Sequence, residues 1–276
     1  MKVYISSDME GSTGITSPEQ VMPGSPEYEF GRRMQQHDTL AAARAALRCG
    51  ADTVLVNDAH EWMINLDPSV FPDGVQIISG APKLLGMVDG VMESDVAFFV
   101  GYHAMAGTEK AVLDHTLSAK VIFSIKLNGV NFGETALSAL FCGAVGVPVG
   151  LVCGDHAACL EAASILGPEL ETCEVKEGVG RLAALTLPAV TTEALIDDAV
   201  ERAMKKAAAG ICPKLAMDGP YRLETTFHTA AQTDAAGLVP GSERIAGRTL
   251  VYNTDDVFEL RRWISSAIDV CGCVPF

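Results

Sequence analysis

The sequence predicts an α/β fold with a mostly parallel sheet flanked by helices. Short runs of β-branched and other apolar residues alternate with longer segments of helical pattern, which is typical of parallel α/β sheets. The composition of the 276 residues, 49% apolar and 20% charged, is that of a folded globular chain. Residues 53–56, which are all β-branched or leucine, have the composition of a buried strand.

The first half of the chain supplies the expected strands at residues 2–6, 53–56, 75–78 and 96–100. Ser25, Pro26 and Glu27 form a helix start, with an N-cap, a proline in the first turn and an acidic residue behind it. This helix is expected to run to about Cys49 and to end at Gly50. A further helix is expected near residues 82–92.

The second half continues this alternation and then changes beyond Pro213. The uncharged stretch 135–154 is long enough to span a membrane, but several Gly and Pro residues interrupt it, so we expect a buried helix, a turn and a buried strand. The expected strands are 121–127, 149–153, 222–227 and 249–252. The expected helices are 132–142, 157–166, one capped by Thr191 or Thr192 that ends at Lys205, Lys206 and Gly210, and 255–268.

The net charge of −15 and the pI near 4.7 bear on partners and location. A polyanion is repelled by such a field, so we expect no nucleic acid partner. The acid excess suits cation binding, although surface carboxylates that favour solubility explain it equally well. No secretion signal precedes Asp8 and Glu10, so we expect a cytoplasmic protein that does not enter a membrane. Its eight cysteines contain no C-x-x-C pair and are expected to be free thiols.

Asp8 and Glu10 directly follow the first expected strand. In an extended backbone, residues two apart point to the same side, so the two carboxylates converge. Their mutual repulsion favours a bound cation. An exposed acidic loop is the alternative interpretation of this motif on its own.

His60 and His103 stand just beyond the ends of two further expected strands. Ligands of parallel sheets gather beyond the carboxyl ends of the strands, and histidine is the commonest metal ligand in proteins. A lone histidine there is an ordinary surface or core residue, but two of them together with the acidic pair predict a metal site. Asp58 is a candidate to orient the ring of His60.

Glu134 and His115 each permit two interpretations. Glu134, at an expected helix start, is either a further ligand or an acid that complements the helix dipole, and sequence physics alone favours the second. His115 lies beside Asp114 in a polar loop and is either a general base or a solvated residue.

Several common catalytic motifs are missing from the sequence. It contains no G-x-G-x-x-G, no Gly-Lys-Ser/Thr phosphate loop and no G-x-S-x-G elbow. His60-Glu61 begins like a zincin motif, but Ile64 stands where the second histidine is required. These absences disfavour dinucleotide-binding, nucleotide-hydrolysing, serine-hydrolase and thermolysin-type functions.

The chain resembles the bacterial D-aminopeptidase family of two-zinc metallopeptidases. The matching segments occur in family order over nearly the whole chain. They are Ser7-Asp8-Met9-Glu10-Gly11, Val56-Asn57-Asp58-Ala59-His60, Gly101-Tyr102-His103-Ala104, Asp114-His115-Thr116, Gly133-Glu134 and Val239-Pro240-Gly241. The segment 223–233 fits less clearly, so substrate specificity is not carried across it.

The resemblance implies two zinc ions held by side chains of two strand-end histidines and three acids, with Asp8 between the metals. These residues are Asp8, Glu10, His60, His103 and Glu134. It gives His115 a catalytic role as nucleophile or base. It also implies a Rossmann-like sheet with a second, smaller α/β region, a ring-like homo-oligomer, and removal of N-terminal residues, often D-amino acids, from short peptides. Manganese or cobalt can replace zinc among such oxygen and nitrogen ligands.

Domain organisation and function each leave alternatives open. We expect an N-terminal α/β metal-binding region over residues 1–120 and a C-terminal region over residues 121–276 that contributes Glu134, or else one compact unit. The alternative functions are a two-metal amidase that acts on cell-wall-derived peptides, and a metal- or peptide-binding module without catalysis.

Overall fold

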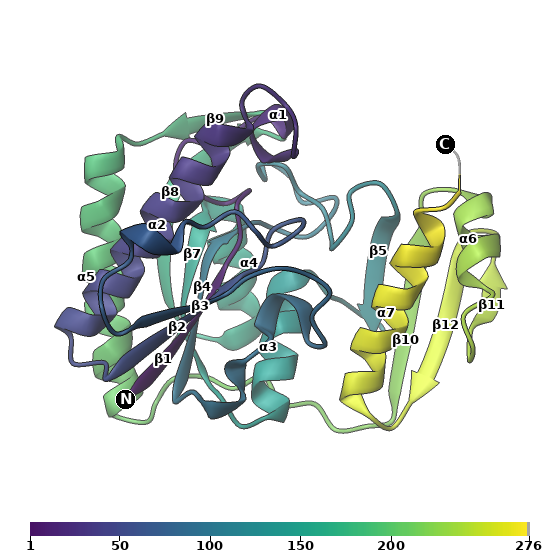
Figure 1. Cartoon of the computed structure of the whole chain (residues 1–276). Coiled ribbons are helices and arrows are strands. Elements are labelled where there is room, and N and C mark those ends of the chain that lie inside the picture. Colours follow the sequence, from purple (N-terminus) through teal and green to yellow (C-terminus); the bar gives the residue numbers. More distant parts are fainter. Residues whose placement is uncertain (275–276) are drawn as a thin grey trace.

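The computed structural model describes residues 1–274 and contains two sheets (Figure 1). The larger sheet has seven strands in the order β3-β2-β1-β4-β7-β8-β9. All neighbours pair in parallel except the edge strand β9, which runs antiparallel to β8. The strands are β1 (Lys2–Ser7), β2 (Thr53–Asp58), β3 (Val75–Ile78), β4 (Val96–Tyr102), β7 (Val149–Asp155), β8 (Glu171–Gly180) and β9 (Ala183–Thr186). The predicted fold class is confirmed.

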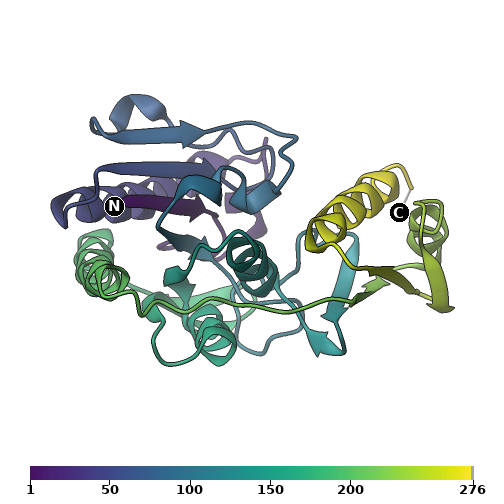
Figure 2. The ribbon, with the colours of Figure 1, turned by 90° about the horizontal axis from the view of Figure 1, so that it is seen from below.

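Helices cover both faces of this sheet. On one face, α2 (Tyr28–Arg48) and α5 (Ala189–Ala208) lie against each other, and on the other lie α3 (Glu134–Ala144) and α4 (His156–Leu166) (Figure 2). Strand residues alternate between the two cores: Val3 and Ile5 pack beneath α2 and α5, whereas Tyr4 belongs to the opposite core. The short helix α1 (Pro18–Val21) contacts α2.

The smaller sheet is antiparallel, with its five strands in the order β11-β12-β10-β5-β6. These strands are β5 (Ile122–Leu127), β6 (Val130–Asn131), β10 (Tyr221–Phe227), β11 (Glu243–Ala246) and β12 (Thr249–Thr254). The helices α6 (Ala230–Ala236) and α7 (Val257–Cys271) pack with this sheet, and α7 also contacts α3 of the larger unit. Helix α7 therefore connects the smaller sheet with the larger unit, and both views show it packed on one face of that sheet.

The chain passes between the two sheets more than once. Strands β7, β8 and β9 return to the larger sheet after β5 and β6 have begun the smaller one. A division near residue 120 stays a prediction about folding units, because the strand order alone does not test it.

Some predicted element boundaries are wrong for local reasons. Residues 82–92 form two short 3₁₀ turns, η2 (Gly86–Val88) and η3 (Val91–Glu93), because Gly86 and Gly90 both adopt positive φ and interrupt a helix. Ser25 does not cap α2, which begins at Tyr28. Instead, a capping box formed by Ser17 and Gln20 starts α1.

Other elements differ in extent or were not predicted. Helix α5 begins at Ala189 behind Pro188, so neither predicted threonine is its cap. Helix α3 begins at Glu134, two residues later than predicted. The uncharged stretch 135–154 forms most of α3, a turn and most of β7, as predicted. The elements without a prediction are α1, α6, β6, β8, β9, β11 and the 3₁₀ turn η1 (Pro68–Val70).

Two further findings concern the cysteines and the length of the helices. All eight cysteines are free, with Cys49 and Cys273 exposed and the rest buried. Within residues 1–274, no helix combines the length and the apolar character needed to cross a membrane.

Candidate metal centre

Three neighbouring parallel strands bring the predicted strand-end ligands together. Strand β1 lies between β2 and β4, and all three run in the same direction, so their carboxyl ends lie side by side. Asp8 and Glu10 follow β1, His60 follows β2 and His103 follows β4. All four side chains are buried at this edge of the sheet.

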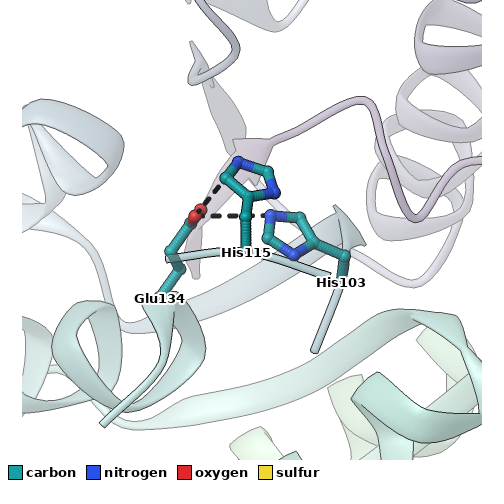
Figure 3. A group of neighbouring side chains, drawn as sticks. All are labelled: His103, His115 and Glu134. Carbon is teal, nitrogen blue, oxygen red and sulfur yellow. Dashed lines mark ion pairs between the residues drawn. The ribbon is translucent and has the colours of Figure 1, made fainter. Parts of the chain in front are cut away.

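Glu134 and His115 reach the same place from outside these strands. Glu134 is the first residue of α3, and His115 lies in the loop between β4 and β5. Figure 3 shows both side chains beside His103. Glu134 Oε1 is 3.3 Å from His103 Nε2 and 3.6 Å from His115 Nε2, and the two imidazole rings stack with centroids 4.1 Å apart. The side chain of Glu134 therefore points into the cluster, although its place at a helix start favours a simple dipole role.

Asp8 lies between two groups of side chains. Its Oδ1 is 3.4 Å from His60 Nδ1, and its Oδ2 is 3.6 Å from His103 Nε2. Glu10 Oε2 is 3.0 Å from the same nitrogen of His60. One group thus contains Asp8, Glu10 and His60, and the other contains Asp8, His103 and Glu134. Ligand atoms of Asp8, Glu10 and His103 also lie within 4.8 Å of one another, so the two groups are contiguous.

The donor atoms of this cluster fit divalent metal ions. Buried polar atoms normally have hydrogen-bond partners, yet Asp8 Oδ2, Glu10 Oε2 and His103 Nε2 make no hydrogen bond to any described residue. In a tetrahedral zinc site with bonds of about 2.0–2.1 Å, neighbouring ligand atoms stand about 3.4 Å apart. The ligand separations here, 3.0 to 3.6 Å, match that spacing.

Main-chain carbonyls fix which nitrogen of each ring faces the cluster. His60 Nε2 lies 2.7 Å from the carbonyl oxygen of Val21, so this nitrogen donates and Nδ1 faces the carboxylates. His103 has the opposite arrangement, because its Nδ1 lies 3.0 Å from the carbonyl oxygen of Ala104 and Nε2 faces inward. Such hydrogen bonds to the outer nitrogen are the usual support of metal-ligating histidines.

Charges within the buried cluster compensate one another when no metal ion is present. Burial, together with the neighbouring Glu10, raises the pKa of Asp8 to about 7. Burial acts to lower the pKa values of His60 and His103, but the adjacent carboxylates outweigh it and raise both well above their usual value. Protons on the histidines thus balance the acids, a role that divalent cations can take over.

His115 differs electrostatically from the other two histidines. Burial and the adjacent His103 lower the pKa of His115, which favours a neutral ring. Its Nδ1 lies 2.9 Å from the carbonyl oxygen of Leu113, so Nε2 is the unprotonated nitrogen. The side chain keeps 15% of its surface exposed, compared with 1% for His103. A neutral, accessible imidazole with a fixed tautomer suits proton transfer.

A buried lysine of β8 holds the loop that carries Glu10. Lys176 Nζ donates to the carbonyl oxygens of Glu10, Ser12 and Ile15 at 2.6, 2.8 and 2.8 Å. These bonds tie the loop after β1 to a strand far along the chain. Sequence patterns do not reveal this contact, because its acceptors are main-chain atoms that every residue carries.

The loop that carries His115 is also fastened at several points. Arg181, in the turn between β8 and β9, forms an ion pair of 3.0 Å with Asp114. Asp155 Oδ2 accepts a hydrogen bond of 2.7 Å from the main-chain nitrogen of Val112. The carboxylate of Asp114, which precedes His115 in the sequence, therefore anchors the loop.

Asp58 does not orient the imidazole of His60. Its carboxylate accepts hydrogen bonds from the side chain of Asn65 at 2.9 Å and from the main-chain nitrogen of Leu66 at 3.0 Å. Asn65 Nδ2 in turn donates to the carbonyl oxygen of His60. Asp58 thus fixes the backbone after β2, while Val21 supplies the acceptor for the ring.

A cavity of about 740 Å³ opens in front of the cluster. This volume is within the usual range for small-molecule sites. Its walls include Asp8, His60 and His115 on one side, and Arg261, Ser265 and Asp269 of α7 on the other.

Comparisons with known proteins agree on one family. A family model described as D-aminopeptidase, peptidase M55, matches residues 1–266. A D-aminopeptidase of Bacillus subtilis (strain 168) is 32% identical over 264 residues, which cover 94% of this chain and 93% of that protein. The solved structure of the Zn-dependent D-aminopeptidase DppA from Bacillus subtilis, a self-compartmentalizing protease, matches with a TM-score of 0.95 at 29% identity, over 100% of both chains.

Proposed function

The chain belongs to the D-aminopeptidase family of hydrolases, and from this premise we propose that it is a zinc-dependent aminopeptidase that removes N-terminal D-amino acids from short peptides. The observation that carries the proposal is the position of Asp8, whose two carboxylate oxygens face two separate histidines. A carboxylate placed in this way suits a bridge between two metal ions.

The proposed ligand sets follow from the distances around Asp8. Glu10 and His60 would complete one site, and His103 and Glu134 the other. The relative's zinc dependence and the mixture of nitrogen and oxygen donors favour zinc, with manganese or cobalt as substitutes. A pair of such ions supplies Lewis acidity, which polarises a carbonyl and lowers the pKa of water toward ~7.

His115 is the proposed general base. Its Nδ1 is occupied by the carbonyl of Leu113, so Nε2 can accept a proton at the cavity wall. In peptide hydrolysis it would take a proton from the attacking water and return it to the leaving amine. The ion pair between Arg181 and Asp114 keeps this loop, and hence the imidazole, in place.

Metal content tests the proposal directly. Protein purified without chelators should contain ~2 zinc ions per chain by mass spectrometry, because a co-catalytic site holds two. Asp8→Ala removes the shared ligand and should lose both ions and activity. Glu61→Ala is a matched control, because Glu61 is an exposed acid of the same cavity outside the cluster. A wild-type chain that takes up no zinc would overturn the proposal.

A substrate panel separates the proposed activity from its alternatives. The proposed enzyme is expected to cleave D-alanyl peptides. It should not cleave the same peptides after N-acetylation, nor the corresponding L-alanyl peptides. Cleavage that persists on N-acetylated, cell-wall-derived peptides would favour a two-metal amidase. Tight peptide binding without turnover under any metal would favour a binding module.

Assembly and location extend the proposal. The relative is described as self-compartmentalizing, so we propose that this chain also forms a ring-like homo-oligomer, and light scattering after size exclusion should give a multiple of 29.1 kDa. A monomer would contradict this. The eight free thiols favour the reducing cytoplasm as its location.

A further inference from the structure

Helix α7 carries the cavity wall that faces the cluster. Arg261 and Ser265, one helical turn apart, both line the cavity, and Figure 2 shows α7 packed on one face of the smaller sheet. Arg261 also lines a small adjoining pocket together with Glu134 and Leu117. The guanidinium group therefore lies close to the proposed metal ligands, although it belongs to the last helix of the chain.

Arg261 is a partly buried cation without an ionic partner. Among residues 1–274, no carboxylate oxygen lies within 4.0 Å of its guanidinium, and its side-chain hydrogen bond goes to Ser265 Oγ. By contrast, Arg181 pairs with Asp114, and the next residue, Arg262, pairs with Glu259, each at 3.0 Å. A desolvated cation that lacks a counter-ion is costly unless a ligand supplies one.

The surrounding acids act on Arg261 only from a distance. Burial lowers the pKa of Arg261, while the charges of Asp269, Asp89 and Glu134 oppose that effect. A guanidinium stays protonated at any physiological pH. The Asp89 carboxylate already accepts a hydrogen bond of 2.8 Å from the main-chain nitrogen of Leu85. Arg261, which lines the cavity, thus has no ion pair among residues 1–274 that a ligand would have to displace.

A glycine of η2 leaves room for the guanidinium. Gly86 has φ +56°, and a Cβ atom at this position would lie 2.1 Å from Nη2 of Arg261. The arginine therefore lies against the backbone of the larger unit as well as on α7. This contact restricts the orientation of the guanidinium N–H groups of Arg261.

We propose that Arg261 binds the C-terminal carboxylate of a dipeptide substrate, an inference that rests on the proposed function. The planar guanidinium offers paired donors that match a carboxylate. In a dipeptide, the carboxylate lies only one residue, about 3.8 Å of chain, beyond the scissile bond. Arg261 lines the cavity of about 740 Å³ together with Glu134, so one dipeptide in that cavity can reach both the proposed metal ligands and this cation. The substrates are then dipeptides with a free carboxylate.

Kinetics on a matched pair of substrates tests this role. The substrates are D-alanyl-D-alanine and its C-terminal amide, measured with the zinc-loaded enzyme. Wild type should prefer the free acid by ~10- to 100-fold in kcat/KM, which is the usual effect of a hydrogen bond to a charged group. Arg261→Met should lose this preference through KM, so that its kcat/KM on the free acid falls to its own value on the amide. Arg261→Lys keeps the positive charge without the paired guanidinium donors. Its preference for the free acid should lie between those of wild type and Arg261→Met.

Controls separate substrate recognition from structural damage. Arg262→Met changes the neighbouring exposed arginine and should leave both substrates unaffected. Activity on the amide reports that Arg261→Met is folded; if that variant does not fold, the acid-to-amide ratio of Arg261→Lys decides.

Four outcomes would overturn the assignment. The first is an equal loss of kcat/KM on both substrates in a folded Arg261 variant. The second is a folded Arg261→Met variant that keeps the wild-type preference for the free acid. The third is loss of the preference only in Lys120→Met, which alters an exposed cation of the same cavity. The fourth is a wild type that cleaves acid and amide equally, which refutes this inference alone. A wild type that cleaves neither refutes the proposed function with it.

Discussion

At the scale of single residues, His115 is distinguished from the other cluster histidines by what its ring contacts. It stacks on His103 and keeps a free Nε2 at the cavity, whereas the inward nitrogens of His60 and His103 lie closer to carboxylates. Stacking on the proposed ligand His103 places His115 beside the proposed metal site without requiring it to hold a metal ion. This placement predicts different consequences for removing His115 and for removing Asp8.

His115→Ala should retain both metal ions and lose turnover. The expected fall in kcat is ~10²- to 10⁴-fold, which is typical for loss of a general acid–base group. Steady-state kinetics and metal analysis on the same sample measure both properties. His156→Ala is the control, because His156 is a partly exposed residue of α4 that pairs with Glu174. Full activity would end the proposed role, and loss of one ion would make His115 a ligand.

Lys83 provides a pH-dependent contribution at the end of β2. Its Nζ donates to Asn57 Oδ1 and to the carbonyl oxygen of Asp58, each at 2.7 Å, and burial lowers its pKa to about 8. In the unfolded chain the pKa of lysine is ~10.4. Between these values the unfolded chain binds more protons, so the free energy of unfolding rises with pH.

The comparison of wild type with Lys83→Met isolates this contribution. Denaturant unfolding at pH 7 and pH 10 should show a larger gain in stability, or a smaller loss, for wild type than for the variant. The sign follows from a folded pKa below the unfolded one, which makes the stabilisation complete above ~10.4 and absent below about 8. Equal changes in both proteins would contradict the assignment.

At the scale of elements, the loop after β1 approaches the end of β4 so closely that only a glycine fits. The Gly11 main-chain nitrogen donates to the carbonyl oxygen of Gly101 at 2.8 Å, and a Cβ at Gly11 would lie 1.8 Å from the carbonyl oxygen of Tyr102. This contact sets the distance between the segments that carry Glu10 and His103. The close approach of two loops thus helps to shape the cluster.

Gly11→Ala should therefore damage both stability and metal binding. Overpacking of this kind costs ~1–3 kcal/mol or more, and here the strain falls on the backbone next to the proposed ligands Glu10 and His103. Chemical denaturation and zinc content are the measurements. Gly247→Ala is a matched control, because a Cβ there meets nothing within 4 Å. Similar behaviour of the two variants would show that the β1 loop has room to shift.

At the scale of the whole molecule, the site joins distant parts of the chain. Three strand ends, one helix start and one loop of the larger unit supply the cluster, and α7 of the smaller unit closes the cavity. Metal ions at this place would bind the folded state and not the unfolded chain. Occupancy of the site should therefore be linked to global stability.

Chelation should lower the thermal unfolding midpoint of wild type. A ligand at 100 times its dissociation constant stabilises a protein by ~2.7 kcal/mol, which corresponds to roughly 5–10 °C for a chain of this size. Differential scanning calorimetry before and after removal of metal measures the shift, and added zinc should reverse it. Asp8→Ala should be insensitive to the chelator. A wild-type midpoint that chelation leaves unchanged would argue against metal ions as part of the folded structure.

The fold class, the family and the residues of the cluster could all be predicted from the amino-acid sequence. The segments that form β1, β2 and β4 can be recognised as strands from their apolar and β-branched composition, which is a local property of the sequence. Asp8, His60 and His103 follow near the ends of these strands. The family assignment, which the family match confirms, rests on the same segments. The proposed metal roles stay predictions, although the structure does bring these side chains together.

How the elements pack together could not be predicted from the sequence. The position of β1 between β2 and β4 and the two 3₁₀ turns in place of a helix at residues 82–92 depend on packing between distant segments. The carbonyl that orients His60 and the three that bind Lys176 occur in every residue type, so no sequence pattern marks them. Arg261 reaches the cluster from the last helix, and its proximity to Glu134 exists only once the two units pack together. Long-range geometry decides these features because main-chain atoms and cationic side chains acquire a role only from the groups that the fold places beside them.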